Sequence, residues 1–334
     1  MIPPSPNKMD AGGTASDQGS IKGCANLFKG FWQMENLGYV GGYEEPQMTD
    51  ESYDLALPVV RDTSVIFSSP HSGRKYTVDF LTQTQLDSLS IRSSEDAFVD
   101  MLFDAAPKFG APLITALAPR AFIDLNRAVD ELDPAVIDGV ARGMHNPRVS
   151  SGLGVIPRVV ANGRAIYHGK IDLAEAQARI TRFWRPYHAA LRHLIAQSHE
   201  TFGEAILIDC HSMPHEAIEA HARPGQPKPE VVLGDRFGAA AGNDVMDRVE
   251  AAFVGAGLRV VRNAPFAGAY ITQAYGRPQQ SQHVVQVEID RRLYLDDMRV
   301  EPSRDFADFR RLMAGVVADV TAIGRAAGVR LAAE

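Results

Sequence analysis

The stretch Ala-Ile-Leu-Ile-Asp-Cys-His-Ser-Met-Pro at residues 205–214 gives the clearest indication of the fold class of this chain. Its first four residues form a short, continuous apolar run, which is typical of a strand buried on both faces. Similar runs occur at 65–67, 113–115, 122–123, 231–233, 260–261 and 284–289. We therefore expect a sheet whose strands are covered on both sides.

Segments with helical spacing of apolar residues separate several of these strands. They cover residues 95–109, 173–202, 237–254 and 306–327, and Pro186 is expected to kink the second of them. Alternation of buried strands with helices is typical of a parallel sheet that packs helices against both faces. The sequence therefore predicts an α/β fold with a mostly parallel mixed sheet covered by helices on both faces.

The composition narrows the class of protein. The chain has 334 residues, of which 45% are hydrophobic and 22% charged, and its formal net charge is -7. No basic tract occurs, so neither nucleic acid nor a membrane is expected as a partner. No apolar run reaches the roughly 20 residues of a membrane helix, and the N-terminus lacks the features of a secretory signal, so we expect a cytoplasmic protein. The two cysteines, Cys24 and Cys210, cannot form a Cys-rich zinc site, so any metal ligands must be His and carboxylate.

The chain divides into two parts by sequence pattern. Residues 1–55 contain scattered Pro, Gly, Ser and Thr without a helical or strand period, which predicts a flexible N-terminal extension. Residues 56–334 are expected to form a single α/β domain. Within it, segment 133–170 is rich in Gly, Pro and Arg and predicts a long loop, which in a compact domain is often functional.

Functional side chains stand at the ends of several predicted strands. His71 and His211 each follow an apolar run, Asn126-Arg127 follows a third, and Glu288 lies inside the strand at 284–289. Ligands of parallel α/β sheets gather at the carboxyl ends of the strands, so these residues are candidates for one site. A buried carboxylate such as Glu288 needs a partner or a cation, and Arg127 is the structural alternative as its buried ion-pair partner.

Two histidines on separate strands suggest a metal site. A catalytic zinc ion typically has three protein ligands, so a third, anionic ligand is needed, and the candidates are Glu95 and Asp96. Either residue could instead simply stabilise a helix N-terminus. Asp209, two residues before His211, is expected to face away from it and to hydrogen-bond to the backbone.

The motifs around these residues resemble those of the N-formylglutamate amidohydrolase family, in the order expected for it. They are Ser-Pro-His-Ser-Gly-Arg (69–74), Asp-Leu-Asn-Arg (124–127), Asp-Cys-His-Ser-Met-Pro (209–214), Asn-Ala-Pro-Phe-Ala-Gly-Ala-Tyr-Ile-Thr (263–272) and His-Val-Val-Gln-Val-Glu-Ile (283–289). The resemblance covers about residues 60–325 and so implies that the 56–334 domain is an amidohydrolase. It also implies a fold similar to zinc carboxypeptidases, of the phosphorylase/hydrolase-like type, and to the aspartoacylase and succinylglutamate desuccinylase group.

The resemblance also implies a role for each site residue. His71, Asp96 and His211 match the ligands of one divalent metal ion, with Zn²⁺ expected. Glu288 matches the catalytic glutamate, which would act as general base and then general acid in metal-assisted hydrolysis of an amide. Asn126 and Arg127 match the pair that binds a substrate carboxylate, and Arg127 would thereby hold the scissile bond in place.

The implied substrate is a small anionic N-acyl amino acid, first N-formyl-L-glutamate, which is cleaved to formate and glutamate in histidine breakdown. One position departs from the family, because Gln273 stands where typical members carry Arg after Ile-Thr. This departure keeps open a carboxypeptidase-like or desuccinylase-like hydrolase of another N-acyl amino acid or of a peptide end. A metal-binding scaffold without turnover is disfavoured because it has no need for a buried Glu288. A serine hydrolase is disfavoured because no Gly-x-Ser-x-Gly elbow is present.

Overall fold

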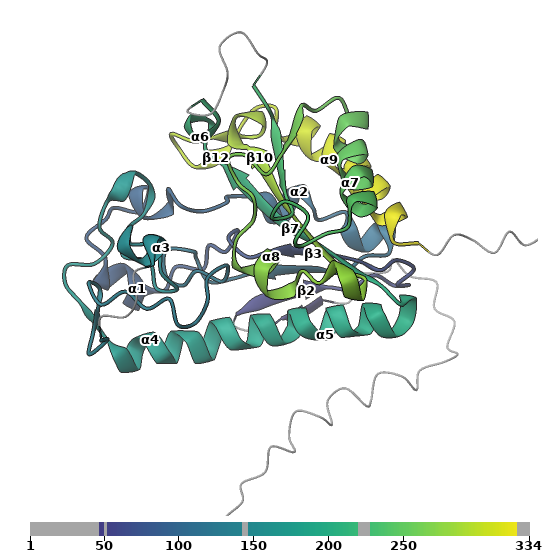
Figure 1. The fold of residues 1–334 in the computed structure, drawn as a ribbon. Coiled ribbons are helices and arrows are strands. Elements are labelled where there is room, and N and C mark those ends of the chain that lie inside the picture. The colour runs from purple at the N-terminus through teal and green to yellow at the C-terminus, as the bar shows by residue number, and fades with distance from the viewer. Residues whose placement is uncertain (1–46, 50–51, 142–145, 220–227, 326–334) are drawn as a thin grey trace, which may run out of the picture. The chain divides into compact units, whose positions relative to one another are not determined.

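Most of the apolar runs found in the sequence form strands of one mixed β-sheet (Figure 1). The computed structural model describes residues 47–49, 52–141, 146–219 and 228–325. Over these residues the main sheet has eight strands, in the order β1-β2-β4-β3-β7-β10-β8-β9. Their bounds are β1 (Gln47–Thr49), β2 (Tyr53–Ala56), β3 (Val65–Ser69), β4 (Leu113–Ala116), β7 (Ala205–Met213), β8 (Val231–Gly234), β9 (Val260–Arg262) and β10 (Gln282–Asp290). Two short pairs stand apart from it, β5 (Ile137–Asp138) with β6 (Ile171–Asp172) and β11 (Leu295–Asp296) with β12 (Glu301–Pro302).

The centre of the sheet is parallel. Strands β4, β3, β7 and β10 run in one direction, whereas β2 is antiparallel to β4, and β8 is antiparallel to β10. The predicted mixed α/β sheet is therefore confirmed, with its parallel part in the middle. The carboxyl ends of β3, β7 and β10 lie at one edge, and the register places Glu288 directly beside His211.

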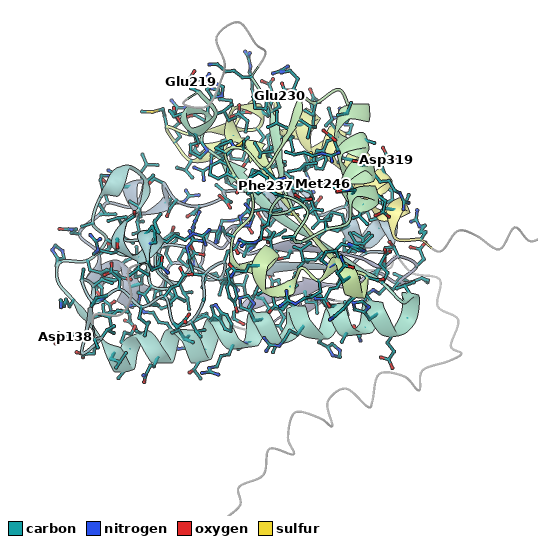
Figure 2. The ribbon with its side chains drawn as sticks, in the orientation of Figure 1. Asp138, Glu219, Glu230, Phe237, Met246 and Asp319 are labelled. Atoms are coloured by element: carbon teal, nitrogen blue, oxygen red, sulfur yellow. The ribbon has the colours of Figure 1, made fainter. Side chains whose placement is uncertain are left out.

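Helices cover both faces of this sheet, as predicted. Because strand side chains alternate, Val65 and Phe67 of β3 point to one face and Ile66 to the other. The first face packs against α2 (Val99–Leu102), α7 (Asn243–Gly255) and α9 (Phe306–Ile323); Met246 of α7, labelled in Figure 2, is fully buried there. The second face packs against α5 (Arg185–Phe202), the long helix beneath the sheet in Figure 1.

The predicted helix at 173–202 is present but carries a local irregularity. It consists of α4 (Leu173–Arg179), a π-helical turn at Ile180–Trp184, and α5. Pro186, where a kink was expected, lies in the first turn of α5 directly after the π-helical turn. Proline lacks an N–H group and its ring clashes with the carbonyl four residues earlier, so the wider turn accommodates it.

The predicted helix at 95–109 is wrong. The structure has only the single turn α2 there, followed by a 3₁₀ turn at Ala106–Phe109. Phe98 adopts a left-handed conformation with φ 63°, which interrupts any helix from residue 95, and Pro107 begins the 3₁₀ turn. Likewise α7 begins after the expected residue 237, because Phe237 is left-handed with φ 58°. The remaining helices are short: α1 (Val78–Gln83), α3 (Pro147–Ser150), α6 (His215–Glu219) and α8 (Tyr270–Tyr275).

The run Phe122-Ile123 is not a strand, which corrects the prediction from its apolar residues. The N–H groups of both residues donate hydrogen bonds to the carbonyl of Pro119, at 2.9 and 3.2 Å, so the chain turns here. This turn follows β4 and directs residues 124–127 toward the carboxyl edge of the sheet.

Two expectations about the ends of the domain have different outcomes. The proposed extension, residues 1–55, lies almost entirely outside the described residues, so its flexibility stays a prediction. The sheet begins before residue 56, because β2 pairs with β4. Among the described helices, none has the length and apolar character needed to cross a membrane.

Candidate active site

The two histidines singled out in the sequence lie side by side. His71 follows β3 by two residues, and His211 lies within β7, which continues further than expected because its pairing with β10 extends to Met213. Their ring centroids are 4.7 Å apart. Gly73 passes so close to the chain that a Cβ atom there would lie 2.1 Å from the carbonyl oxygen of Ala118. Glycine thus permits the tight turn that follows His71.

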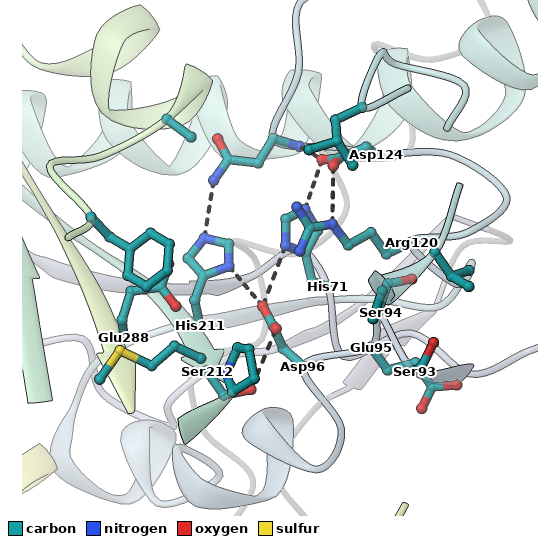
Figure 3. A pocket seen from close by; sticks show the side chains of 18 of the residues that line it. His71, Ser93, Ser94, Glu95, Asp96, Arg120, Asp124, His211, Ser212 and Glu288 are labelled. Carbon is teal, nitrogen blue, oxygen red and sulfur yellow. Dashed lines mark hydrogen bonds and ion pairs between the residues drawn. The ribbon is translucent and has the colours of Figure 1, made fainter. Parts of the chain in front are cut away.

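Both imidazole rings point their Nδ1 atoms at the carboxylate of Asp96 (Figure 3). The distances to Asp96 Oδ2 are 3.3 Å from His71 Nδ1 and 2.9 Å from His211 Nδ1. The backbone N–H of Asp96 donates a 3.0 Å hydrogen bond to the carbonyl of His71, which fixes the two segments together. The structure therefore brings together three residues that are far apart in the sequence.

The opposite nitrogen of each ring also meets a carboxylate. His71 Nε2 lies 2.7 Å from Asp124 Oδ1, and His211 Nε2 lies 3.0 Å from Asp209 Oδ2. Metal-binding histidines typically donate their second ring N–H to a carboxylate in this way, which fixes the ring and its tautomer. Both histidines have this arrangement.

The expectation that Asp209 faces away from His211 is wrong. Side chains alternate along a strand, so residues two positions apart share a face, and Asp209 and His211 do so on β7. Asp124 was part of the quoted Asp-Leu-Asn-Arg motif but was given no role. The signal that could have found both residues was the need of each histidine for a second hydrogen-bond partner.

The cluster His71, Asp96 and His211 fits a divalent cation. One ligand atom from each residue lies within 4.8 Å of the others, and all three residues are buried. His71 Nδ1 is a buried atom without a hydrogen-bond partner. Asp96 uses Oδ1 to accept hydrogen bonds from Arg291 (3.2 Å) and Ser212 (3.3 Å), so Oδ2 remains toward the imidazoles. Two imidazole nitrogens and one carboxylate oxygen form a common ligand set for catalytic zinc.

Glu95 does not belong to this cluster. Its carboxylate accepts a 2.6 Å hydrogen bond from the Tyr76 hydroxyl and two from Arg92, at 3.1 and 3.2 Å. Of the two acidic candidates, only Asp96 faces both histidines.

The charges of the cluster shift its titration. Burial would raise the pKa of Asp96, but the interactions of its carboxylate with His211 and His71 outweigh burial and hold the pKa well below its usual range. Burial opposes charge on His211, yet Asp209 and Asp96 raise its pKa well above the ordinary value. Burial would also raise the pKa of Asp124, but His71 and Arg120 keep it low. Asp96 therefore stays ionised beside the two imidazoles, as a carboxylate ligand of a metal ion must be.

Glu288 lies beside this cluster on β10. Its side chain is 8% exposed, and its Oε1 accepts a 2.8 Å hydrogen bond from Gln286 Nε2. Gln286 is itself held by the backbone N–H of Ala269, which donates to its Oε1 at 2.9 Å. Burial raises the pKa of Glu288 to about 8, against the attraction of His211. A carboxyl group that titrates near neutral pH, next to a cluster with the ligand set for a metal ion, suits proton transfer.

Arg127 is not the ion-pair partner of Glu288, so that alternative does not hold. Its Nε donates to the carbonyl of Leu153 at 2.9 Å and its Nη1 to the carbonyl of Asn126 at 3.0 Å. Its carboxylate neighbour is Glu131, with Oε2 at 3.9 Å from Nε.

Asn126 contacts the cluster directly. Its Oδ1 accepts a 2.7 Å hydrogen bond from the N–H of Ile271, so its Nδ2 faces Asp209 Oδ2 at 3.1 Å and His211 Nε2 at 3.0 Å. These contacts use both ends of the amide group. They place Asn126 behind His211, a position that the expectation of substrate binding did not include.

A pocket of about 940 Å³ opens above the cluster. His71, Asp96, His211 and Glu288 line it, and residues of the predicted loop 133–170 form part of its wall. Five arginines also line it: Arg92, Arg120, Arg127, Arg148 and Arg291. Gln273 does not line it, and its side chain is exposed on α8. Gln273 itself therefore contributes no group to this pocket.

Comparisons with known proteins found a matching family model, similar sequences and a similar structure. The family model for N-formylglutamate amidohydrolase matches residues 63–295. An N-formylglutamate deformylase of Pseudomonas aeruginosa is 29% identical to this chain over 237 residues, and the aligned region covers 70% of this chain and 82% of that protein. A similar protein of Pseudomonas putida with the same name is 28% identical over 236 residues, with the same coverage of both chains. The crystal structure of N-formylglutamate amidohydrolase from Ralstonia eutropha JMP134 matches with a TM-score of 0.77 and 33% identity, covering 82% of this chain and 99% of that one.

Proposed function

Because this chain belongs to the N-formylglutamate amidohydrolase family, we propose that it is a metal-dependent hydrolase of N-acyl amino acids. N-formyl-L-glutamate is its first expected substrate, and formate and glutamate are the products. The observation that carries the proposal is the buried group His71, Asp96 and His211, with Glu288 next to it.

In this proposal the metal ligands are His71 Nδ1, His211 Nδ1 and Asp96 Oδ2. Asp124 and Asp209 hold the opposite ring nitrogens, at 2.7 and 3.0 Å, and so orient both imidazoles. The ligand set of two nitrogens and one oxygen favours Zn²⁺. When bound, such an ion supplies Lewis-acid activation of water and of an amide carbonyl near neutral pH.

Glu288 is the proposed general base and general acid. It would take a proton from the attacking water and deliver that proton to the leaving amine, which restores the carboxylate. Its hydrogen bond from Gln286 holds Oε1, so Oε2 is the atom available for this transfer.

Arginine side chains would bind the anionic parts of the substrate. Arg127 is the proposed ligand for the carboxylate next to the scissile amide, because a guanidinium group can bind a carboxylate through two parallel hydrogen bonds. Arg120 binds Asp124 through Nε at 3.0 Å, and its terminal nitrogens make no hydrogen bond within the described part of the chain. These N–H groups can stabilise negative charge that develops on the carbonyl oxygen. The sequence analysis did not single out Arg120.

Asn126 is proposed to act through its neighbours. Its amide group holds His211 and Asp209 in place and accepts the N–H of Ile271 at the start of α8. It also shares a peptide unit with Arg127, so it links the metal cluster to the substrate-binding arginine.

A second candidate is hydrolysis of a larger N-acyl amino acid or of a peptide end. The observation that favours it is the pocket volume of about 940 Å³, which is in the range of pockets for drug-sized ligands. N-formyl-L-glutamate is smaller than such ligands. The cytoplasmic location and a role in histidine breakdown stay predictions.

One experiment tests the proposed function. The metal content per chain is measured, and release of the acyl group and the amino acid is then assayed on N-formyl, N-acetyl and N-succinyl amino acids. We expect formate release from N-formyl-L-glutamate that stops on chelation and returns with Zn²⁺. Unchanged turnover after complete chelation would contradict metal dependence, and preference for a larger acyl group would favour the second candidate.

A further inference from the structure

The arginines of the pocket differ in how far they are already neutralised. Arg92 makes two hydrogen bonds to the carboxylate of Glu95. Arg291 is bound to Asp96 Oδ1 at 3.2 Å, to Ser212 at 3.1 Å and to a backbone carbonyl. These two side chains therefore have their charge and their N–H groups occupied.

Arg148 is the exception. Its side chain is partly buried and lines the pocket, yet it makes no hydrogen bond and no ion pair with any described residue. A partly buried guanidinium group without an ion-pair partner among the described residues can accept an anion from outside the chain.

The backbone of Arg148 is fixed, and it is connected to Arg127. The N–H of Arg148 donates to Asn146 Oδ1 at 2.9 Å, and its carbonyl accepts the N–H of Leu153 at 2.9 Å. The carbonyl of the same Leu153 accepts Nε of Arg127, also at 2.9 Å. One residue thus ties both arginines to the same stretch of pocket wall.

The charge of Arg148 acts on the neighbours of Arg127 and on Arg127 itself. Burial lowers the pKa of Arg127 and Asp124 opposes this, while the positive charges of Arg120 and Arg148 lower the pKa. Burial raises the pKa of Glu131, while Arg127 and Arg148 oppose that rise. Glu131 forms an ion pair with Arg127, whose Nε lies 3.9 Å from Glu131 Oε2, and the described residues include no such pair for Arg148. Glu131 therefore does not neutralise both arginines.

We propose that Arg148 binds the side-chain carboxylate of a dicarboxylic N-acyl amino acid, while Arg127 binds the carboxylate next to the scissile amide. Arg148 would then set the preference of this site for acidic over neutral side chains. This inference rests on the proposed function. It also explains how a chain with an exposed Gln273 can still recognise two carboxylates. Arg127 is assigned to the inner carboxylate because it follows Asn126, which touches His211.

The test compares two substrates that have nearly the same shape, N-formyl-L-glutamate and N-formyl-L-glutamine. We expect Arg148→Ala and Arg148→Gln to lower kcat/KM for N-formyl-L-glutamate by about 10- to 100-fold, mainly through KM, because a charge-assisted contact is lost. Turnover of N-formyl-L-glutamine should change less than about threefold. Arg304→Ala is the matched control, because Arg304 is 92% exposed and lies outside the pocket.

A binding measurement separates failure of this inference from failure of the proposed function. Calorimetric titration of the metal-loaded protein with L-glutamate and L-glutamine needs no turnover. We expect tighter binding of L-glutamate, and loss of that difference in Arg148→Ala. Equal losses for the acidic and the neutral ligand, or an unchanged preference in both Arg148 variants, would overturn the inference. Absence of hydrolysis with the binding preference intact would overturn only the proposed function.

Discussion

The floor and the wall of the pocket carry opposite charges and are built differently. The floor lies at the carboxyl edge of the parallel strands and holds buried carboxylates, each with a hydrogen bond or a close imidazole contact: Asp96, Asp124, Asp209 and Glu288. The wall comes from loops and a short helix, and it presents guanidinium groups: Arg120, Arg127 and Arg148.

Because the floor is acidic and the wall is basic, the same pocket suits a cation at the floor and an anion at the wall. Neighbouring strands fix Asp209 and Glu288 of the floor, and a backbone hydrogen bond to His71 holds Asp96, which suits a metal ion with strict geometry. In the wall, Arg127 donates to two backbone carbonyls, Arg120 to Asp124, and the Arg148 side chain to no described residue, which suits a substrate that must enter and leave. Damage to the floor should therefore affect chemistry and metal affinity, and damage to the wall should affect substrate affinity.

The largest expected effect is the loss of kcat when Glu288, the proposed catalytic carboxylate of the floor, is replaced. Glu288→Gln should lower kcat by about 1000-fold or more, because the acid-base group is lost while the shape is kept. The bound metal should stay near the wild-type amount, measured by elemental analysis. Glu301→Gln, an exposed change, is the control. Near-normal turnover in Glu288→Gln would end the proposed role of Glu288.

The second prediction concerns the free energy of unfolding of the metal-free protein. Glu288 has a folded-state pKa of about 8, above the ordinary value of 4.5, so the folded state keeps a proton that the unfolded state has lost. The free energy of unfolding should therefore fall as pH rises from about 4.5 to 8. Glu288→Gln should remove the part of this slope that Glu288 contributes, so its free energy of unfolding should exceed that of the wild type by a few kcal/mol above pH 8. Urea unfolding at several pH values measures it, and a gap independent of pH would contradict it.

The third prediction concerns substrate binding by the wall. Arg127→Ala should raise KM for anionic substrates by about 100-fold, because a bidentate contact with a carboxylate is lost, with a smaller change in kcat. The midpoint of thermal unfolding should change little. Arg311→Ala is the matched control, since Arg311 is 77% exposed. If Arg127→Ala mainly unfolds the protein, the arginine has a structural role instead.

The smallest expected effect concerns metal affinity when Asp209, which contacts His211 in the floor, is replaced. Asp209→Asn keeps the shape but weakens the contact with His211 Nε2, so the affinity for the divalent ion should fall by about 10- to 100-fold. Competition with a chromophoric chelator measures this affinity. Asp319→Asn on α9 is the control, because Asp319 is exposed on a helix distant in sequence from the site (Figure 2). Equal affinity in the two variants would remove the argument for Asp209.

The residues of the floor were easier to predict from the sequence than those of the wall. Apolar runs end in His71 and His211, and Glu288 interrupts another run, so strand chemistry marked these positions. The helix expected at 95–109 failed because a left-handed Phe98 depends on tertiary contacts that periodicity does not carry. Asp209 was misjudged because the period of two along a strand was applied in the wrong sense.

Most residues of the wall could not be predicted from the sequence, for a physical reason. Arg120 lies in a loop and Arg148 in the single turn α3, neither of which has an apolar period, and many arginines of this chain form surface ion pairs instead. Only the folded chain shows that Arg148 has no described partner and that Leu153 connects it to Arg127. The role of Asn126 likewise depends on Ile271, which is 145 residues away.

The shared ion of the two histidines is the central claim, and anomalous X-ray diffraction tests it most directly. Crystals of the protein prepared with Zn²⁺ would be measured above and below the zinc edge. The account predicts one strong peak within bonding distance of His71 Nδ1, His211 Nδ1 and Asp96 Oδ2. A peak bound to the Nε2 atoms, a peak elsewhere, or no peak at this cluster would contradict it.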